Sequence, residues 1–459
     1  MKLDNAGTWI AHIGKHVGST SMMNMTAFDY WFRDDPPGVD EVQRYVESRL
    51  ASLPYFRARV RQTPFGVGNS HLVPVDDFDL SRHVEVRVAP GSGSWNELRA
   101  LLAELREEPL DPELPPWHVT VITGVQEVPG GTGRIVCVVT RLEHAVTDGA
   151  GSVALARQLF PDAPSLGRTG AGEVPAADQT QPSLLADALL HLPKRLGAFT
   201  GNVRDALAAR KSQKVTDGDV PPHPPLRGPA PETAIDRANG PLRYRAFAVR
   251  LAEVQRARAL VSGATINDVF IAAVGGALRR YLEKFGELPQ EDLRCAITVA
   301  TAKRDLSPFV GNDFTMAAVP FWIAIEDPVE RLHCVVQSTR AVKEKLRSGP
   351  KVPIERALQA MPPLFIPNIL TKLSGGKSAV NAAVVNVPRG SRPMYFGEAK
   401  SVASFGFPFT DGVPVAHAVS SLGDIATVNV LYDSAAIRDG DAYQEMLEAE
   451  LGAFLDLSA

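Results

Sequence analysis

The stretch Arg134-Ile-Val-Cys-Val-Val-Thr-Arg-Leu-Glu-His-Ala-Val-Thr-Asp-Gly-Ala-Gly-Ser-Val-Ala-Leu-Ala-Arg-Gln-Leu-Phe160 joins two kinds of element across one polar motif. Residues 135–140 are apolar and rich in β-branched side chains, which predicts a buried strand. Residues 152–160 carry apolar side chains at helical spacing and predict a helix. Between them lies Glu143-His-Ala-Val-Thr-Asp-Gly149, a His-x-x-x-Asp-Gly motif. This order of strand, motif and helix indicates an α/β protein with a candidate site at the end of the strand.

His144 is the candidate for chemistry within this motif. Its imidazole can exchange a proton near neutral pH, and a rigid strand would hold the ring while it faces a cleft. Asp148 and Gly149 suggest a turn in which the carboxylate fixes the local geometry and the backbone passes close to another group. The alternative is an ordinary buried or surface histidine, and the motif alone does not decide between the two.

The length of 459 residues predicts two domains of roughly 200 residues each. We place the first domain at residues 1–165 and the second at residues 241–459. Residues 166–240, rich in Pro, Gly and Ala, form a crossover or linker. Within it, residues 184–207 have amphipathic spacing and predict a helix, either packed on one domain or lying on a membrane surface. Both halves interleave helices with strands, as in an α/β fold.

The charge balance gives no reason to expect nucleic acid as a partner, because 48 basic and 52 acidic residues leave a net charge of −4. Cys137, Cys295 and Cys334 lie far apart and form neither a metal-binding spacing nor a disulfide framework, which favours a reducing cytoplasm. No window reaches the roughly 18 apolar residues of a membrane span. We therefore expect a cytoplasmic protein without a metal site, and leave open a peripheral position at a membrane.

Two further segments carry alternatives. Residues 20–33 are dense in Met and aromatic side chains, and form either a packed segment or the wall of an apolar ligand channel. Thr265 is expected to cap a helix whose first turn contains Asp268. Asn267 lies at the mouth of that helix, where it either takes part in capping or faces a developing oxyanion.

Ordered motifs from about residue 20 to residue 455 resemble those of one family. The motifs are Asp76–His83, Pro109–Trp117, Glu143–Gly149, Ala264–Val269, Gly311-Asn312 and Asn386-Val-Pro388. The chain is similar to the bacterial wax ester synthase/diacylglycerol acyltransferase family, among the acyl-CoA-dependent acyltransferases related to chloramphenicol acetyltransferase. The resemblance implies an α/β fold of two chloramphenicol-acetyltransferase-like domains with a channel between them.

The resemblance also implies an activity in lipid metabolism. The expected reaction moves a fatty acyl group from acyl-CoA, a co-substrate rather than a cofactor, to diacylglycerol or a long-chain alcohol. By position in the family's motifs, His144 is the general base, Asp148 the structural aspartate and Gly149 the glycine beside the channel. Asn267 and Asp268 match a pair thought to support the active site. No metal or other cofactor is implied, and a contact with a membrane or lipid droplet stays open.

Two positions depart from the family's pattern. Glu143 replaces the first histidine of the motif, and a carboxylate close to the base would favour the protonated imidazole. Arg389 follows Asn386-Val-Pro where the family usually has glycine, which puts the local shape of the channel in doubt. The alternatives are an acyltransferase for a specialised polar or amine acceptor, and a non-catalytic homologue that binds acyl chains or lipid. The retained His144, Asp148 and Gly149 argue against the second.

Overall fold

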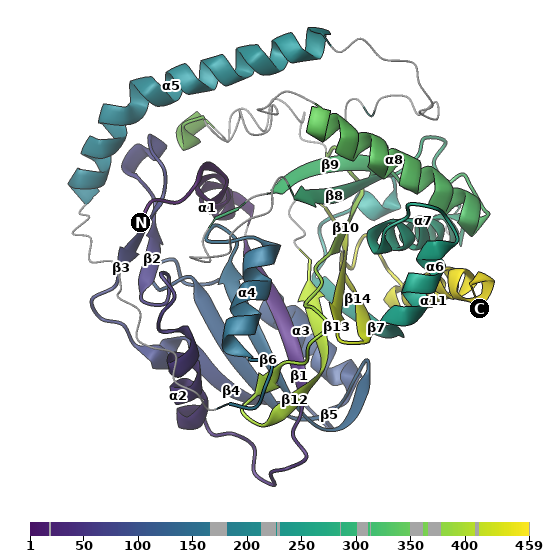
Figure 1. The fold of residues 1–459 in the computed structure, drawn as a ribbon, viewed down its shortest axis with the longest axis horizontal. Coiled ribbons are helices and arrows are strands. Elements are labelled where there is room, and N and C mark those ends of the chain that lie inside the picture. Colours follow the sequence, from purple (N-terminus) through teal and green to yellow (C-terminus); the bar gives the residue numbers. More distant parts are fainter. Residues whose placement is uncertain are drawn as a thin grey trace.

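Two six-stranded sheets, each covered by helices, form the framework of the protein in a computed structural model (Figure 1). The structure describes residues 1–17, 20–165, 181–212, 226, 230–284, 286–300, 311–312, 314–348, 361–365, 378–408 and 413–458. Its mixture of helices and strands confirms the predicted α/β class.

The first sheet has the strand order β11-β12-β1-β6-β5-β4. All neighbouring strands in it are antiparallel except the parallel pair β4 and β5. Its strands are β1 (Ser21–Asp29), β4 (Val84–Val88), β5 (Trp117–Val128), β6 (Gly131–Glu143), β11 (Tyr395–Phe396) and β12 (Ala399–Phe407). The predicted strand at residues 135–140 is confirmed as the buried middle of β6.

The second sheet has the strand order β7-β14-β13-β10-β8-β9. Its central strand β10 is parallel to both of its neighbours, β13 and β8. The strands are β7 (Leu242–Arg250), β8 (Arg294–Ala300), β9 (Phe314–Pro320), β10 (Ala382–Asn386), β13 (Val415–Leu422) and β14 (Ile425–Asp433). A separate hairpin pairs β2 (Ala58–Arg61) with β3 (His71–Pro74).

The helices form two groups along the chain, one before residue 230 and one after it. Those before residue 230 are α1 (Asn5–Val17), α2 (Val39–Leu50), α3 (Trp95–Glu107), α4 (Gly149–Leu159) and α5 (Gln181–Ser212). Those after it are α6 (Leu251–Ala259), α7 (Ile266–Lys284), α8 (Pro328–Ser348) and α11 (Gly440–Leu457). The predicted helix at residues 184–207 is confirmed as part of α5, which runs along the outside of the molecule in Figure 1.

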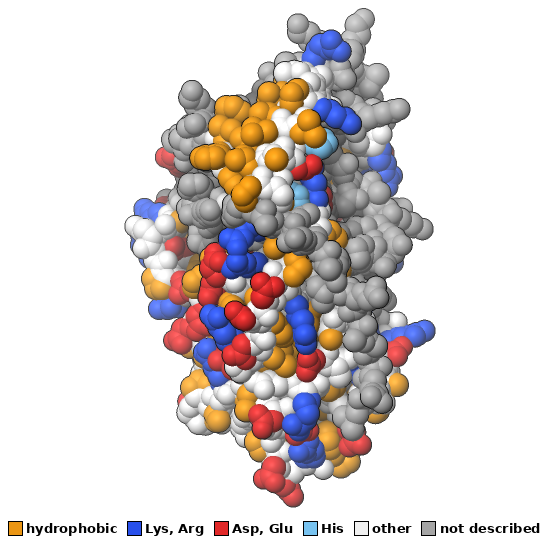
Figure 2. Space-filling model, turned by 90° about the vertical axis from the view of Figure 1, so that its left-hand side faces the viewer, with side chains coloured by type: hydrophobic (Ala, Val, Ile, Leu, Met, Phe, Trp, Pro, Cys, Tyr) orange, Lys and Arg blue, Asp and Glu red, His pale blue; other side chains and the backbone are white. Residues whose placement is uncertain are grey.

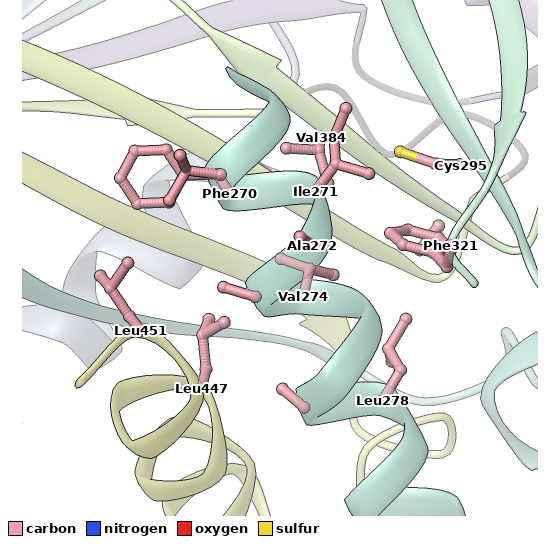
Figure 3. Close-up of a cluster of buried hydrophobic side chains, with 14 of the residues drawn as sticks. Phe270, Ile271, Ala272, Val274, Leu278, Cys295, Phe321, Val384, Leu447 and Leu451 are labelled. Atoms are coloured by element: carbon pink, nitrogen blue, oxygen red, sulfur yellow. The ribbon is translucent and has the colours of Figure 1, made fainter. Parts of the chain in front are cut away.

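Helix α7 is the centre of the second hydrophobic core. Figure 3 shows Phe270, Ile271 and Leu278 of α7 among side chains of the second sheet and of α11. The helix is buried on several faces because a sheet lies on one side and helices α8 and α11 on others. This explains why its sequence is apolar over more than a single stripe. Full burial of each large apolar side chain stabilises the fold by about 1.5–3 kcal/mol.

Strands β11 and β12 join the sheet of the other half. They come from residues 395–407, within the range assigned by sequence to the second domain, yet β12 pairs with β1 from Met23 to Asp29. Strand β12 also packs against β13 and β14 of the second sheet. The predicted division at residues 165 and 241 therefore does not separate the strands of the two sheets, because β11 and β12 come after residue 241 and lie in the first sheet.

The segment at residues 20–33 contains a central strand rather than a peripheral one. Strand β1 lies between β6 and β12, and its Met23, Met25 and Ala27 are fully buried. Packing therefore accounts for this face, and Met22 and Phe28 are also buried on the other. The other face of β1 carries Asn24, which is partly exposed.

Candidate active site

The His-x-x-x-Asp-Gly motif occupies the connection between β6 and α4. Main-chain hydrogen bonds hold its start, with His144 N donating to Thr20 O at 3.1 Å and Glu143 N donating to Pro116 O at 2.8 Å. His144 is thus fixed by the end of a buried strand and by the residue that precedes β1. This is the rigid placement that the sequence predicted for it.

Asn312 sets the orientation of the His144 ring. Its side-chain oxygen lies 3.0 Å from His144 Nδ1, and its side-chain nitrogen donates to His144 O at 3.0 Å and to Ala145 O at 3.4 Å. Because the amide nitrogen faces two carbonyls, the amide oxygen must be the atom that faces Nδ1. Nδ1 therefore carries the proton, and Nε2 keeps its lone pair.

Asn312, which belongs to the second half of the chain, is held by residues of the first half. Gly311 N donates to Val146 O at 2.7 Å, and Asn312 N donates to the Asp4 carboxylate at 2.6 Å. The other Asp4 oxygen accepts from Gly7 N at 2.6 Å in the first turn of α1. A Cβ on Gly7 would lie only 2.2 Å from Ala145 O, so α1 approaches the motif closely. Asp4, Asn312 and His144 thus form one chain of contacts.

Sequence reasoning did not assign Asn312 or Asp4 to the site. Gly311-Asn312 was recognised only as a family landmark, and residues 1–20 carried no expected element. The available signal was the landmark itself, since an Asn at a turn can present its side chain to another segment.

The pKa of His144 is lowered from its ordinary value, chiefly because burial disfavours the charged ring. A hydrogen bond to its own main-chain carbonyl, the charge of Asp148 and the bond to Asn312 act in the opposite direction. The ring is therefore neutral at pH 7. With Nδ1 protonated, the arrangement provides a proton acceptor at Nε2.

Asp148 and Gly149 form the start of α4. Asp148 is buried and caps the helix, because its carboxylate accepts from Gly151 N at 3.1 Å. Gly149 faces Val387 of the second half, whose nearest methyl would lie 3.6 Å from a Cβ on the glycine. Asp148 thus stabilises the start of α4, and Gly149 lies at the contact between the two halves of the chain.

Glu143 is bound through its carboxylate to Thr20. Its carboxylate accepts a hydrogen bond from the Thr20 hydroxyl, and burial raises its pKa, while the positive charge of Arg106 acts to lower it. The charges with the largest influence on the pKa of His144 are those of Asp148 and Arg106. The negative charge at the position of the first motif histidine is therefore balanced by Arg106 of α3.

Thr265 caps α7 as predicted, because Asp268 N in the first turn donates to the Thr265 hydroxyl at 3.3 Å, and Asp268 bonds back to Thr265. The Asp268 carboxylate accepts from Thr265 N at 2.8 Å and from the Thr265 hydroxyl at 2.7 Å, and its other oxygen accepts from the Thr339 hydroxyl at 2.8 Å. Asn267 lies beside it, and its buried side-chain oxygen has no hydrogen-bond partner among the residues that the structure describes. Among the described residues, no hydrogen bond links Asn267 or Asp268 to His144.

Comparison with known proteins identifies the chain. Residues 7–270 match the wax ester synthase/diacylglycerol acyltransferase catalytic domain, and residues 310–454 match the C-terminal domain of the same proteins. The chain belongs to this family. It is therefore an acyltransferase, as the motifs indicated.

Relatives and solved structures agree with this membership. A Mycobacterium tuberculosis protein with the provisional name diacylglycerol O-acyltransferase is 30% identical over 419 residues, covering 88% of this chain and 87% of its own. A Mycobacterium bovis protein with the same provisional name is 30% identical over 329 residues, covering 70% and 69%.

The structure of the wax ester synthase/diacylglycerol acyltransferase from Marinobacter aquaeolei VT8 matches with a TM-score of 0.67 at 18% identity, covering 100% of this chain and 99% of its own. The first condensation domain of the calcium-dependent antibiotic synthetase matches with a TM-score of 0.61 at 14% identity, covering 100% and 96%. These likenesses confirm the predicted fold.

Among the described residues, no group of three or more His, Cys, Asp or Glu side chains is arranged to hold a metal ion. None of the helices that the structure describes combines the length and hydrophobicity needed to cross a bilayer.

Proposed function

We propose that this acyltransferase moves a fatty acyl group from acyl-CoA to the hydroxyl group of diacylglycerol or a long-chain alcohol, with His144 as the general base. The observation that carries the proposal is the contact between His144 Nδ1 and Asn312 Oδ1 at 3.0 Å. It fixes the tautomer and leaves Nε2 as the proton acceptor.

The reaction needs one base and two bound substrates. His144 Nε2 takes the proton from the acceptor hydroxyl as the oxygen attacks the thioester carbonyl. The C–S bond of the tetrahedral intermediate then breaks, and the imidazolium returns the proton to the thiolate, giving an ester and free CoA. Asn267 stays our candidate for the donor that stabilises the oxyanion, through its side-chain NH₂.

An exposed apolar surface supports a peripheral contact with a membrane or lipid droplet as part of this proposal. Leu189 and Leu190 of α5 are exposed, Leu190 to 77%, and Phe65 in the adjoining turn at Pro64–Gly66 is exposed to 81%. Figure 2 shows hydrophobic side chains gathered on the upper part of this face. A patch of this kind favours a lipid surface, where the acceptor would be dissolved.

The test is thiol release from palmitoyl-CoA in the presence of phospholipid vesicles that contain diacylglycerol or hexadecanol. We expect release that depends on the acceptor, and protein that sediments with the vesicles. Leu190→Gln should reduce sedimentation without reducing release when the acceptor is supplied in detergent.

The same assay separates the alternatives. Release with neither lipid acceptor, but with a polar or amine acceptor, would contradict the lipid assignment. Absence of release with every acceptor, despite binding of palmitoyl-CoA, would identify a non-catalytic homologue.

The acid limb of the pH profile is a second test of the base. Because the reaction needs neutral imidazole and burial lowers the pKa of His144, the neutral form persists to lower pH than in an ordinary histidine. We expect kcat/KM to be constant near pH 7 and to fall on acidification with a midpoint below 6.5, the ordinary value.

Asn312→Ala is the matched variant for this profile. Its hydrogen bond raises the pKa of His144, so its loss should move the midpoint further down and lower the plateau. A midpoint above 6.5 in the wild type would contradict the assignment of His144.

A further inference from the structure

Arg389 lies on a continuation of β10 toward α4 and β1. Val387 N donates to Val419 O at 2.9 Å and Arg389 N donates to Ser421 O at 2.7 Å, so residues 387–389 run beside β13. Alternate residues of this segment share one face. Val387 meets the start of α4 at Gly149, and Arg389 reaches Ser152 one turn further along that helix. The Arg389 side chain therefore points toward α4, the helix that follows the His144 motif.

The Arg389 guanidinium is buried without a counter-ion. The residue is 2% exposed, and no described carboxylate forms an ion pair with it. Among the described residues, Nη2 donates to Asn24 Oδ1, Nη1 has a 3.5 Å contact with the Ser152 hydroxyl, and Nε has no acceptor. Guanidinium groups buried in this way normally face a carboxylate or phosphate.

A second arginine lies next to Arg389, so its neighbour adds positive charge and does not neutralise the guanidinium. Arg157 of α4 donates from Nε to Arg389 O at 3.1 Å and from Nη1 to Pro393 O at 3.1 Å. Burial, followed by the charge of Arg157, lowers the pKa of Arg389 to about 10, so it remains a cation at pH 7. An unpaired buried charge of this kind destabilises a fold unless a ligand compensates it.

Asn24, which accepts from the Arg389 guanidinium, is itself partly exposed. Asn24 lies in the middle of the central strand β1, yet it is partly exposed while its neighbours Met23 and Met25 are fully buried. Near Asn24 lies the hydroxyl of Ser420, which is buried and has no hydrogen-bond partner among the described residues. A Cβ on Gly406 would lie 2.7 Å from Ser420 Oγ and 3.9 Å from Asn24 Oδ1, so Gly406 leaves these groups room. The described side chains around Asn24 thus offer hydrogen-bond donors, and none of those that contact Arg389 is an acid.

We propose that Arg389, with Asn24 and Ser420, binds the carboxylate of a substrate, so that this enzyme prefers an acidic substrate over a neutral one. The proposal rests on the acyl transfer proposed above and narrows its substrate class. The carboxylate could belong to the acceptor, as in a hydroxy fatty acid, or to the far end of the acyl group.

The test compares full-length wild type with Arg389→Met, which removes the charge, and Arg389→Lys, which keeps it. Arg392→Met is the matched control, because Arg392 is an exposed arginine in the same loop, paired with Asp162. In one arm, palmitoyl-CoA is offered with ω-hydroxypalmitate or hexadecanol. In the other, hexadecanedioyl-CoA or palmitoyl-CoA is offered with hexadecanol.

We expect the wild type to favour the acidic substrate in one arm, which identifies its source. Arg389→Met should lower kcat/KM for that substrate by about 10- to 100-fold, the range for a buried hydrogen bond to a charged group, and leave the neutral substrate nearly unchanged. Arg389→Lys should retain part of the preference, and Arg392→Met all of it. Equal losses for acidic and neutral substrates would overturn the proposal and indicate a structural or CoA-binding role.

Binding separates failure of this proposal from failure of the proposed reaction. In the His144→Ala protein, hexadecanedioate should raise Tm and its dimethyl ester should not. The rise should vanish when Arg389→Met is added. If the diacid gives no larger shift than the diester, the carboxylate site is wrong, whether or not the protein transfers acyl groups.

Discussion

Replacing His144 by alanine is expected to lower acceptor-dependent acyl transfer by about 10²- to 10⁴-fold, the contribution of a positioned general base. The variant removes the Nε2 lone pair, so the attacking hydroxyl must lose its proton to water. The main chain of the motif should keep its place, because His144 N bonds to Thr20 O and Asn312 still bonds to the carbonyls of residues 144 and 145.

The measurement is CoA release under saturating acceptor, with unfolding monitored by circular dichroism. His333→Ala, an exposed histidine of α8, is the matched control and should retain full activity. A His144→Ala protein that is folded and transfers acyl groups within tenfold of the wild-type rate would exclude His144 as the base.

Glu450→Leu is expected to lower the free energy of unfolding by about 3–5 kcal/mol, the cost of breaking a buried ion pair from one side. Glu450 of α11 accepts from Arg331 of α8 and from Arg280 of α7 at 2.5 Å. Arg331 is 1% exposed and also donates to Ala272 O at 2.9 Å, so its charge cannot turn to solvent when the carboxylate is removed.

Urea unfolding followed by circular dichroism measures this loss. Glu448→Leu is the control, since Glu448 lies two residues earlier on the exposed face of the same helix and contacts only Gln444 among the described residues. A loss below about 1 kcal/mol for Glu450→Leu would indicate that the three helices tolerate an unpaired Arg331. Leucine is chosen because it keeps the volume and adds no new donor.

The elements best predicted from the sequence are those whose signals are local. The β-branched run at 135–140 and the helical spacing after it correspond to β6 and α4. The cap of α7 by Thr265 and Asp268 was also predictable, because a capping contact spans only three residues. Family motifs then placed His144 at the site without any knowledge of its neighbours in space.

What could not be predicted depends on distant residues. Asn312 lies 168 positions from His144, and Asp4 lies 308 positions from Asn312, so no spacing rule connects them. The membership of β12 in the first sheet was hidden for the same reason, since an apolar strand can pair with either sheet. The sequence showed that Arg389 differs from the family's glycine. It could not show that Arg389 lacks a counter-ion among the described residues, because that depends on which residues surround it in space.

The position of β12 has a consequence for the order of assembly. During synthesis, β1 and β6 leave the ribosome some 250 residues before β12, as residue numbers 143 and 399 show. Until β12 has been synthesised, one edge of β1 has no hydrogen-bonding partner. An unpaired edge next to an apolar, Met-rich face can pair with strands of other chains and cause aggregation. The first sheet therefore closes only after most of the second half has been made, and any fragment ending before residue 395 lacks this closure.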